Sequence, residues 1–198
     1  MSIDYIQRIK EIGVVGAGGA GFPTHVKLNS KAEIVIINGA ECEPLLRVDQ
    51  QLMEFYPQDV IDGLKVAMAQ TGASRGVIGV KAKYKNAIAN LTELIKTESS
   101  IEIKVVGDYY PAGDEQQLVY EVIHKVVPLM GIPLDVGAVV INVLTAINIA
   151  RDKPVTERVV TVTGAVAKPQ TLIVPVGTSF RELIKSCEGP TEIGRAHV

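Results

Sequence analysis

Short apolar segments alternate along this chain with longer segments of helical periodicity, and this order restricts the fold more than any other feature. Buried strands are predicted at 34–37, 77–80, 101–106 and 138–141. Apolar residues recur at intervals of three and four in the segments 59–70 and 87–95, as in amphipathic helices. Strands joined through crossover helices pair in parallel, and a parallel sheet is covered on both faces. We therefore expect an α/β domain over residues 1–155, with a mostly parallel sheet covered by helices.

The pattern changes after Lys153-Pro154. Residues 159–166 are rich in β-branched side chains, residues 171–176 are typical of a returning strand, and Gly177-Thr178-Ser179 predicts a helix start. A hairpin followed by a helix is the beginning of a β-grasp fold. Because so few elements bury little apolar surface, we expect 156–192 to be the start of an incomplete β-grasp domain. Residues 193–198 match no pattern and are expected to be a tail left by cloning.

Composition excludes several classes of protein. Of the 198 residues 47% are hydrophobic, so the chain is not disordered. The 20 basic and 22 acidic residues are interspersed, and without a basic cluster we expect no nucleic-acid partner. The apolar runs are far shorter than the roughly 20 residues of a membrane helix, which predicts no transmembrane segment. With no signal-peptide pattern and two distant cysteines, the expected location is cytoplasmic.

A glycine-rich segment precedes the first strand. The run 16–21 matches the G-x-G-x-x-G pattern of dinucleotide-binding folds. However, the residues between this run and the strand 34–37 include Pro23 and are too few for the crossover helix of a Rossmann unit. We therefore predict a different ligand-binding loop, whose peptide N–H groups approach a flat or phosphorylated ligand, with Lys27 as a nearby cation. A flexible glycine-rich turn is the alternative.

Polar clusters directly follow two of the predicted strands. Residues 38–44 read Asn-Gly-Ala-Glu-Cys-Glu-Pro, and residues 109–115 read Tyr-Tyr-Pro-Ala-Gly-Asp-Glu. Ligands of open parallel sheets bind outside the carboxyl ends of the strands, where both clusters would lie. The amide and carboxylates of the first cluster could bind ribityl hydroxyls or a nicotinamide amide. The alternatives are a solvated acidic turn for the first cluster and a stabilised helix N-terminus for the second.

These segments resemble a known family. Residues 18–24, followed by 38–44, are similar to the flavin-binding fold of the 51 kDa NADH-oxidising subunit of respiratory complex I, and more closely to the C subunit of the Rnf electron-transport complex. The later hairpin and helix resemble the soluble-ligand-binding β-grasp domain that follows the flavin domain in this family. The resemblance implies FMN as cofactor, NADH as substrate, and transfer of electrons to other subunits of a complex that can be membrane-bound.

The resemblance also implies a set of site residues. Glu43 occupies the position that meets the nicotinamide and is the expected catalytic residue. The cofactor-binding residues implied are Gly16, Gly18, Gly19, Lys27, Asn38, Glu41, Tyr110, Gly113, Asp114, Glu115, Asn142 and Thr145. No metal ligand is predicted. The family's C-x₂-C-x₂-C run is absent, so an iron–sulfur cluster is expected only in a missing C-terminal part.

Four positions depart from the complex I pattern. Ala17 stands where the complex I protein has Arg, Ala40 where it has Asp, Asp114 where it has Glu, and Ile141 where it has Asn. The first hypothesis is therefore an FMN-dependent NADH-oxidising electron-transfer subunit, cytoplasmic or peripheral on the cytoplasmic membrane face. The second is a non-catalytic scaffold or ligand-binding module of such a complex. A pyridine-nucleotide or cobalamin sensor is a third, resting on the β-grasp analogy alone.

Overall fold

The computed structural model describes residues 4–191 and 196–197. The chain divides into two compact units. The first combines Met1–Cys42 with Asp49–Pro154, and the second combines Glu43–Val48 with Val155–Val198.

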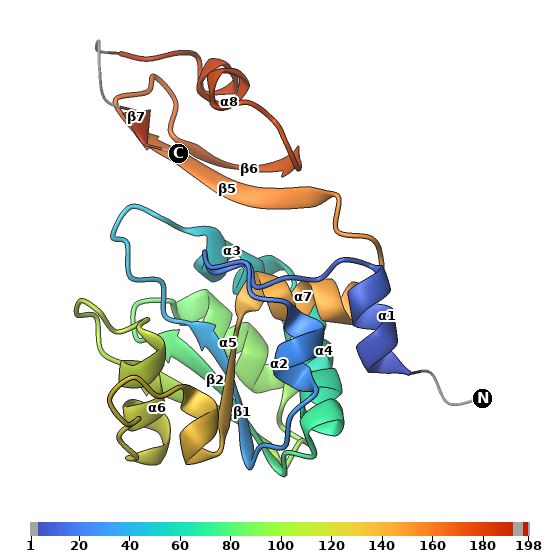
Figure 1. The fold of residues 1–198 in the computed structure, drawn as a ribbon. Coiled ribbons are helices and arrows are strands. Elements are labelled where there is room, and N and C mark those ends of the chain that lie inside the picture. The colour runs from blue at the N-terminus through green and yellow to red at the C-terminus, as the bar shows by residue number, and fades with distance from the viewer. Residues whose placement is uncertain (1–3, 192–195, 198) are drawn as a thin grey trace. The chain divides into compact units, whose positions relative to one another are not determined.

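The first unit is built on a four-stranded parallel sheet, as expected (Figure 1). Its strands are β1 (Ile34–Gly39), β2 (Arg75–Lys81), β3 (Ile101–Val106) and β4 (Ala138–Asn142), arranged in the order β3-β2-β1-β4. The chain winds outward from β1 to β3 and then returns to the other side of β1, so the winding direction reverses between β1 and β4. In open α/β sheets, ligands bind outside the carboxyl ends of the strands at this reversal.

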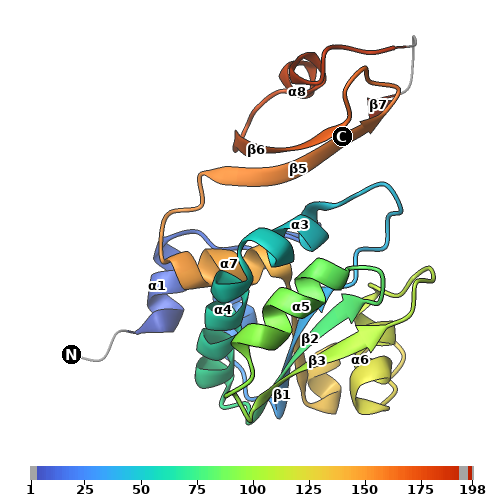
Figure 2. The ribbon, with the colours of Figure 1, turned by 180° about the vertical axis from the view of Figure 1, so that it is seen from behind.

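Helices cover both faces of this sheet (Figures 1 and 2). One face is covered by α4 (Pro57–Thr71), α5 (Lys85–Leu94) and α7 (Val143–Arg151), and the other by α6 (Glu115–Ile123). The smaller helices are α1 (Tyr5–Glu11), α2 (Thr24–Leu28), α3 (Val48–Phe55) and the 3₁₀ helix η1 (Pro133–Val136). Burial on both faces explains why β1 and β4 are almost uniformly apolar, whereas the edge strand β3 includes Glu102 and Lys104. Within the described residues, no helix is long and apolar enough to cross a membrane.

Periodicity does not reveal α7. This helix follows β4 without an intervening turn, and its buried residues, from Val143 to Ile149, lie on nearly all sides. A segment that is apolar all round has no polar face to distinguish a helix from a strand. The boundary is set by Asn142, whose Oδ1 accepts a hydrogen bond from the Leu144 N–H at 2.9 Å and caps the helix.

The second unit contains the expected hairpin and helix. Strands β5 (Glu157–Gly164) and β6 (Gln170–Pro175) pair in antiparallel fashion, and α8 (Phe180–Ser186) begins at a capping box formed by Ser179. The segment 193–198, expected to be a tail, includes β7 (Ala196–His197), which pairs with β5; its other residues lie outside the described part. That this domain is incomplete stays a prediction.

Helices α4 and α7 come into close contact at Gly63. A Cβ built on Gly63 would lie 2.0 Å from the backbone oxygen of Ala146. A side chain cannot occupy that space, so glycine is required for α7 to reach its position over the sheet.

Replacement of Gly63 by alanine should therefore destabilise the first unit. We expect Gly63→Ala to lower the free energy of unfolding by about 2 kcal/mol or more, because the added methyl group must push α4 away from α7. Urea unfolding followed by circular dichroism measures the change. Gln58→Ala, at an exposed position of α4, should shift the midpoint very little. Equal stability of the two variants would contradict the packing described for Gly63.

Candidate functional site

The glycine loop has a defined backbone course. The Gly16 N–H donates to the Phe22 carbonyl oxygen at 2.8 Å, which closes the loop at its base. Gly19 and Gly21 have φ values of +133° and +64°, which glycine adopts without strain. Gly18 and Gly19 are exposed, so the tip of the loop presents backbone to solvent.

This loop is attached to the start of α7. The Ala17 N–H donates to Thr145 Oγ1 at 2.9 Å, joining residues 128 positions apart. Gly18 lies against the side chain of Asn142, since a Cβ on this glycine would be 3.5 Å from Asn142 Cβ. Asn142 in turn is the register partner of Asn38 on the neighbouring strand. The structure therefore brings the glycine loop, Asn142, Thr145 and Asn38 together at the point where the winding direction reverses.

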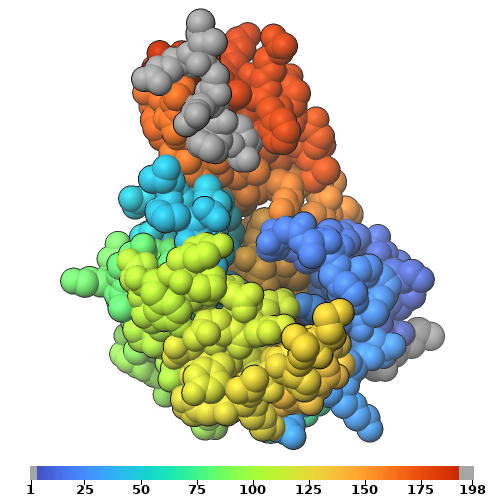
Figure 3. Space-filling view, turned by 60° about the vertical axis from the view of Figure 1, so that its left-hand side comes forward, coloured from blue at the N-terminus to red at the C-terminus, as the bar shows by residue number. Residues whose placement is uncertain are grey.

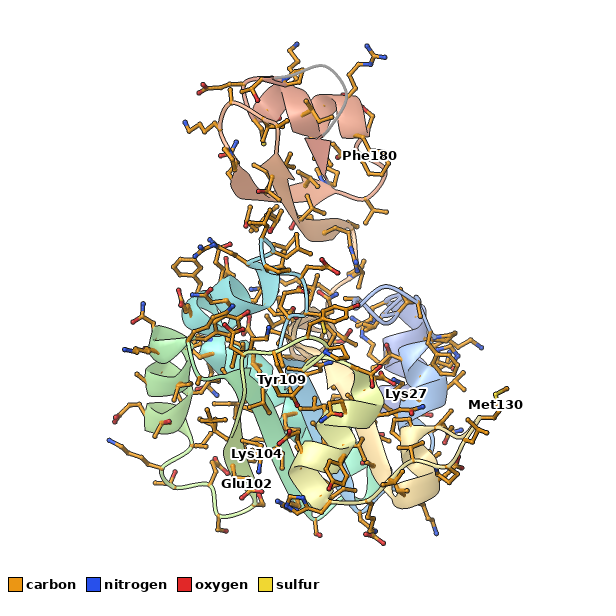
Figure 4. All side chains as sticks on the ribbon, turned by 90° about the vertical axis from the view of Figure 1, so that its left-hand side faces the viewer. Lys27, Glu102, Lys104, Tyr109, Met130 and Phe180 are labelled. Carbon is orange, nitrogen blue, oxygen red and sulfur yellow. The ribbon has the colours of Figure 1, made fainter. Side chains whose placement is uncertain are left out.

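Lys27 connects α2 to two other elements of the first unit. Its Nζ donates to the Val140 carbonyl oxygen at 2.8 Å and lies 3.3 Å from Glu115 Oε1 at the start of α6. Figure 4 shows Lys27 reaching from α2 toward α6, and in Figure 3 the N-terminal segment (blue) and the α6 segment (yellow) lie side by side. The Lys27 side chain is 28% exposed.

The two polar clusters meet across the end of β2. Asn38 Nδ2 donates to the Gly113 carbonyl oxygen at 2.7 Å, and the Gly113 N–H donates to Cys42 Sγ at 3.2 Å. A Cβ on Gly113 would lie 2.0 Å from the Ala40 carbonyl oxygen. The predicted site residues Asn38 and Gly113 are therefore in contact, and close packing of the loops is by itself a reason for glycine at position 113.

The remaining residues of the second cluster lie at the start of α6. Asp114 Oδ1 accepts from the N–H groups of Gln116 and Gln117, each at 3.0 Å, and caps the helix. Capping is the structural role left open for Asp114 by the sequence, and a contact with a ligand stays a prediction. Tyr110 is 76% exposed, so its ring is available to a ligand. The neighbouring Tyr109, labelled in Figure 4, instead donates from its hydroxyl to Glu121 Oε1 at 2.8 Å.

The two glutamates of the first cluster fall in different units. Glu41 is half-buried in the first unit, whereas Glu43 is exposed and begins the segment Glu43–Val48 of the second unit. The expected role of Glu43 at the nicotinamide therefore stays a prediction.

A buried carboxylate that the sequence analysis misses lies beside this site. Asp49 is 7% exposed, and Asn142 Nδ2 donates to both of its oxygens, at 3.1 and 3.2 Å. Burial, followed by the negative charge of Glu41, raises the pKa of Asp49 from 3.8 to about 7, while the hydrogen bond from Asn142 acts in the opposite direction. The sequence does carry a signal: Asp49, Leu52 and Met53 have the helical spacing of one buried face.

A cavity of about 700 Å³ lies elsewhere in the first unit, at the amino ends of β1 and β2. Four of its charged side chains form two pairs: Lys125 Nζ lies 3.4 Å from Glu33 Oε2, and Arg75 Nε donates to Glu102 at 2.8 Å. Figure 4 shows Glu102 and Lys104 on β3, at this end of the sheet. None of the predicted site residues is among its described lining. Within the described residues, no group of three or more His, Cys, Asp or Glu side chains could hold a metal ion.

Comparison with known proteins decides the family. The Nuo51 FMN-binding domain family matches residues 9–151, and the SLBB domain family matches residues 159–197. The chain belongs to the Nuo51 FMN-binding domain family. The resemblance expected from the glycine loop and the 38–44 cluster is thus confirmed, and so is the resemblance of the C-terminal hairpin and helix to a soluble-ligand-binding domain.

Curated relatives of this Nuo51-family chain include two kinds of oxidoreductase. It is 47% identical over 189 residues to the cobalamin reductase PduS of Citrobacter freundii, covering 93% of this chain and 42% of the relative. It is 40% identical over 199 residues to the C subunit of the Na⁺-translocating ferredoxin:NAD⁺ oxidoreductase complex of Acetobacterium woodii, covering 96% of this chain and 45% of the relative. The chain therefore spans less than half the length of these relatives.

Solved structures with the same fold include the NAD⁺-reducing [NiFe]-hydrogenase. In its air-oxidised state, one chain of that enzyme matches with a TM-score of 0.76 and 23% identity, over 94% of this chain and 38% of the other. The H₂-reduced state gives a TM-score of 0.79 at 22% identity, over 94% and 39% of the two chains. At this identity the likeness shows the fold alone, and it confirms the predicted fold class.

The raised pKa of Asp49 predicts how the stability of this Nuo51-family domain depends on pH. The unfolded chain loses the Asp49 proton near 3.8, whereas the folded chain keeps it until about 7. Wild-type stability should therefore fall relative to Asp49→Asn as the pH rises between these values, and the difference should level off above them. Over this range, the free energy of unfolding of the wild type should fall relative to that of Asp49→Asn by on the order of 4 kcal/mol. Urea unfolding from pH 4 to pH 8.5 measures it.

Asp62→Asn is the matched control for this measurement. Asp62 also accepts a hydrogen bond from an amide side chain, that of Gln58 at 2.9 Å, but it is not enclosed as Asp49 is. The free energy of unfolding of Asp62→Asn should change with pH as that of the wild type does. Parallel curves for wild type and Asp49→Asn would show that burial does not hold the Asp49 proton.

Proposed function

We propose that this domain binds FMN and oxidises NADH, passing the electrons to a partner protein. The observation that carries the proposal is the position of the exposed glycine loop. The loop is hydrogen-bonded to Thr145 and packs against Asn142, at the point where the winding direction of the sheet reverses between β1 and β4. Ligands of α/β sheets bind at this position. Because Gly18 and Gly19 lack side chains, the backbone can closely approach a phosphate group or a flat ring.

The residues present fit a flavin nucleotide. The positive end of α7 and the positive charge of Lys27, whose side chain is partly exposed, would favour a phosphate beside the glycine loop. In this arrangement Asn38 would contact the ribityl chain or ring edge, and the exposed ring of Tyr110 would meet the nicotinamide side. Glu41 would belong to the flavin site, and Glu43 would meet the nicotinamide. When bound, FMN would accept a hydride and release the electrons singly to an acceptor.

The chain's own contribution is orientation and electrostatics. Asn38 is held by its bond to Gly113, so its amide is fixed relative to the loop that follows β3. Lys27 is held by the carbonyl oxygen of Val140, which fixes its ammonium group on β4, the strand that ends at Asn142. Groups fixed in this way are already oriented when a ligand arrives, so less conformational entropy is lost on binding.

A non-catalytic ligand-binding or scaffold module is the second candidate. Two departures from the complex I pattern are buried, Ala40 completely and Ile141 with 4% exposure, so apolar side chains replace polar ones in the interior. In addition, the charge of Lys27 is partly balanced by Glu115. A domain altered in this way could hold a ligand without turnover.

The electron acceptor belongs to the proposal as well. A corrinoid is the first acceptor to test, because the relative at 47% identity is a cobalamin reductase. Ferredoxin is the second, since another relative belongs to a ferredoxin:NAD⁺ oxidoreductase complex. This chain covers less than half of either relative, so delivery to an acceptor is proposed for the longer protein.

An absorption spectrum tests the cofactor and the reaction together. After incubation with FMN and gel filtration, the protein should retain flavin absorbance, and NADH should bleach it under nitrogen. Failure to retain FMN would contradict the proposal. Retained flavin that is bleached by dithionite but not by NADH would instead favour the non-catalytic candidate.

Replacement of Lys27 tests the placement of the phosphate. We expect Lys27→Gln to weaken FMN binding by about 10-fold to 100-fold, because a charge-assisted hydrogen bond is lost, while riboflavin binding should change little. Quenching of flavin fluorescence measures both affinities. Lys31→Gln, an exposed lysine on the segment that follows α2, should leave them within about twofold. Equal losses for FMN and riboflavin would mean that Lys27 does not act on the phosphate.

A further inference from the structure

We propose that Asp49 is a proton-accepting positioning residue, whose carboxylate becomes protonated when a phosphate-bearing ligand binds at the glycine loop. The inference rests on the proposed function, because it assumes that the loop receives the phosphate of FMN. It assigns a role to Asp49, which is not among the expected site residues, and it predicts that a proton is taken up from solvent when the ligand binds.

A single amide group separates Asp49 from the loop. Asn142 Nδ2 donates to both Asp49 oxygens, at 3.1 and 3.2 Å. The same nitrogen lies 4.0 Å from the position that a Cβ on Gly18 would take. Asn142 Oδ1 is meanwhile engaged by the Leu144 N–H, so its amide cannot rotate without uncapping α7. Negative charge at the loop therefore acts on the Asp49 carboxylate across one fixed side chain.

The charges around Asp49 do not neutralise it. Glu41, in the loop after β1, is negative and acts on Asp49 directly. The glycine loop, residues 13–22, has no charged side chain. Arg151, the one charged residue of α7, lies at its far end and pairs with Asp59 at 2.8 Å. On α3 itself, Glu54 accepts a hydrogen bond from Gln50 at 2.9 Å.

Charge repulsion then drives proton uptake. Burial and Glu41 already bring the pKa of Asp49 to about 7, so near neutral pH the free protein holds this proton part of the time. A phosphate at the loop adds a further negative charge and favours the neutral acid. The proton comes from solvent, and no electron is transferred. The protonated carboxyl group still accepts from Asn142 Nδ2 with one oxygen, so Asn142 stays in place beside Gly18 while the negative charge of Asp49 is removed.

Calorimetry tests the coupling directly. FMN is titrated into the wild-type protein at pH 7.5 in two buffers of different ionisation enthalpy, and the difference in heat gives the number of protons exchanged. We expect uptake on the order of 0.3–0.5 proton per FMN, and an affinity that weakens by up to about tenfold between pH 6.5 and pH 8.5. Riboflavin, which has no phosphate, should bind with far less uptake.

Variants separate this inference from the proposed function. Asp49→Asn should bind FMN with little proton uptake and a flat pH profile, whereas Asp62→Asn should behave as the wild type. Uptake that persists in Asp49→Asn, or that is as large with riboflavin as with FMN, would overturn the inference and leave FMN binding intact. If wild type binds no FMN at all, the proposed function fails and this inference fails with it.

A second measurement does not depend on how Asp49→Asn folds. The infrared difference spectrum of wild type with and without FMN should gain the carbonyl band of a protonated carboxyl group. That band should shift when the protein is labelled with ¹³C at aspartate side chains. A spectrum without an added carboxyl band would overturn the inference.

Discussion

The interactions of the Asn142 side chain are the ones on which the arrangement of the site depends. It ends β4, caps α7 through Leu144, holds the buried carboxylate of Asp49, and lies against Gly18 of the glycine loop. It also stands beside Asn38 in the register of the sheet. An amide can do all this because it donates and accepts at the same time. Four segments distant in sequence thus converge on one residue at the reversal of the sheet.

Close backbone approach is the second constraint, and glycine supplies it at two positions. Gly63 lets α4 pack onto α7, and Gly113 lets the loop after β3 rest against the loop after β1. In both places a Cβ would lie 2.0 Å from a carbonyl oxygen. The contact at Gly63 fixes α7, and therefore the helix start that faces the glycine loop. The contact at Gly113 fixes the two polar clusters relative to each other.

The electrostatics of the site is a balance between a few charges. Lys27 places a positive charge against the Val140 carbonyl oxygen of β4, and Glu115 also contacts it. Glu41 and Asp49 place two acids near the same region, one of them buried. A site that receives an anionic ligand in such surroundings gains from a group that can give up its negative charge. The raised pKa of Asp49 gives it that property near neutral pH.

The sequence by itself determined the elements whose signals are local. The amphipathic helix α4, the strand β3 and the start of α8 at Ser179 follow from hydrophobic period and capping chemistry, and the glycine loop with its 38–44 cluster is enough to name the family. Tertiary structure alone decided that the Ala17 N–H donates to Thr145 and that Lys27 donates to the carbonyl oxygen of Val140. It also decided that Asp49 is enclosed behind Asn142. The physical reason is that these burial patterns and hydrogen bonds depend on residues far away in the chain. Hydrophobic periodicity, in contrast, depends only on residues within a turn or two of one another.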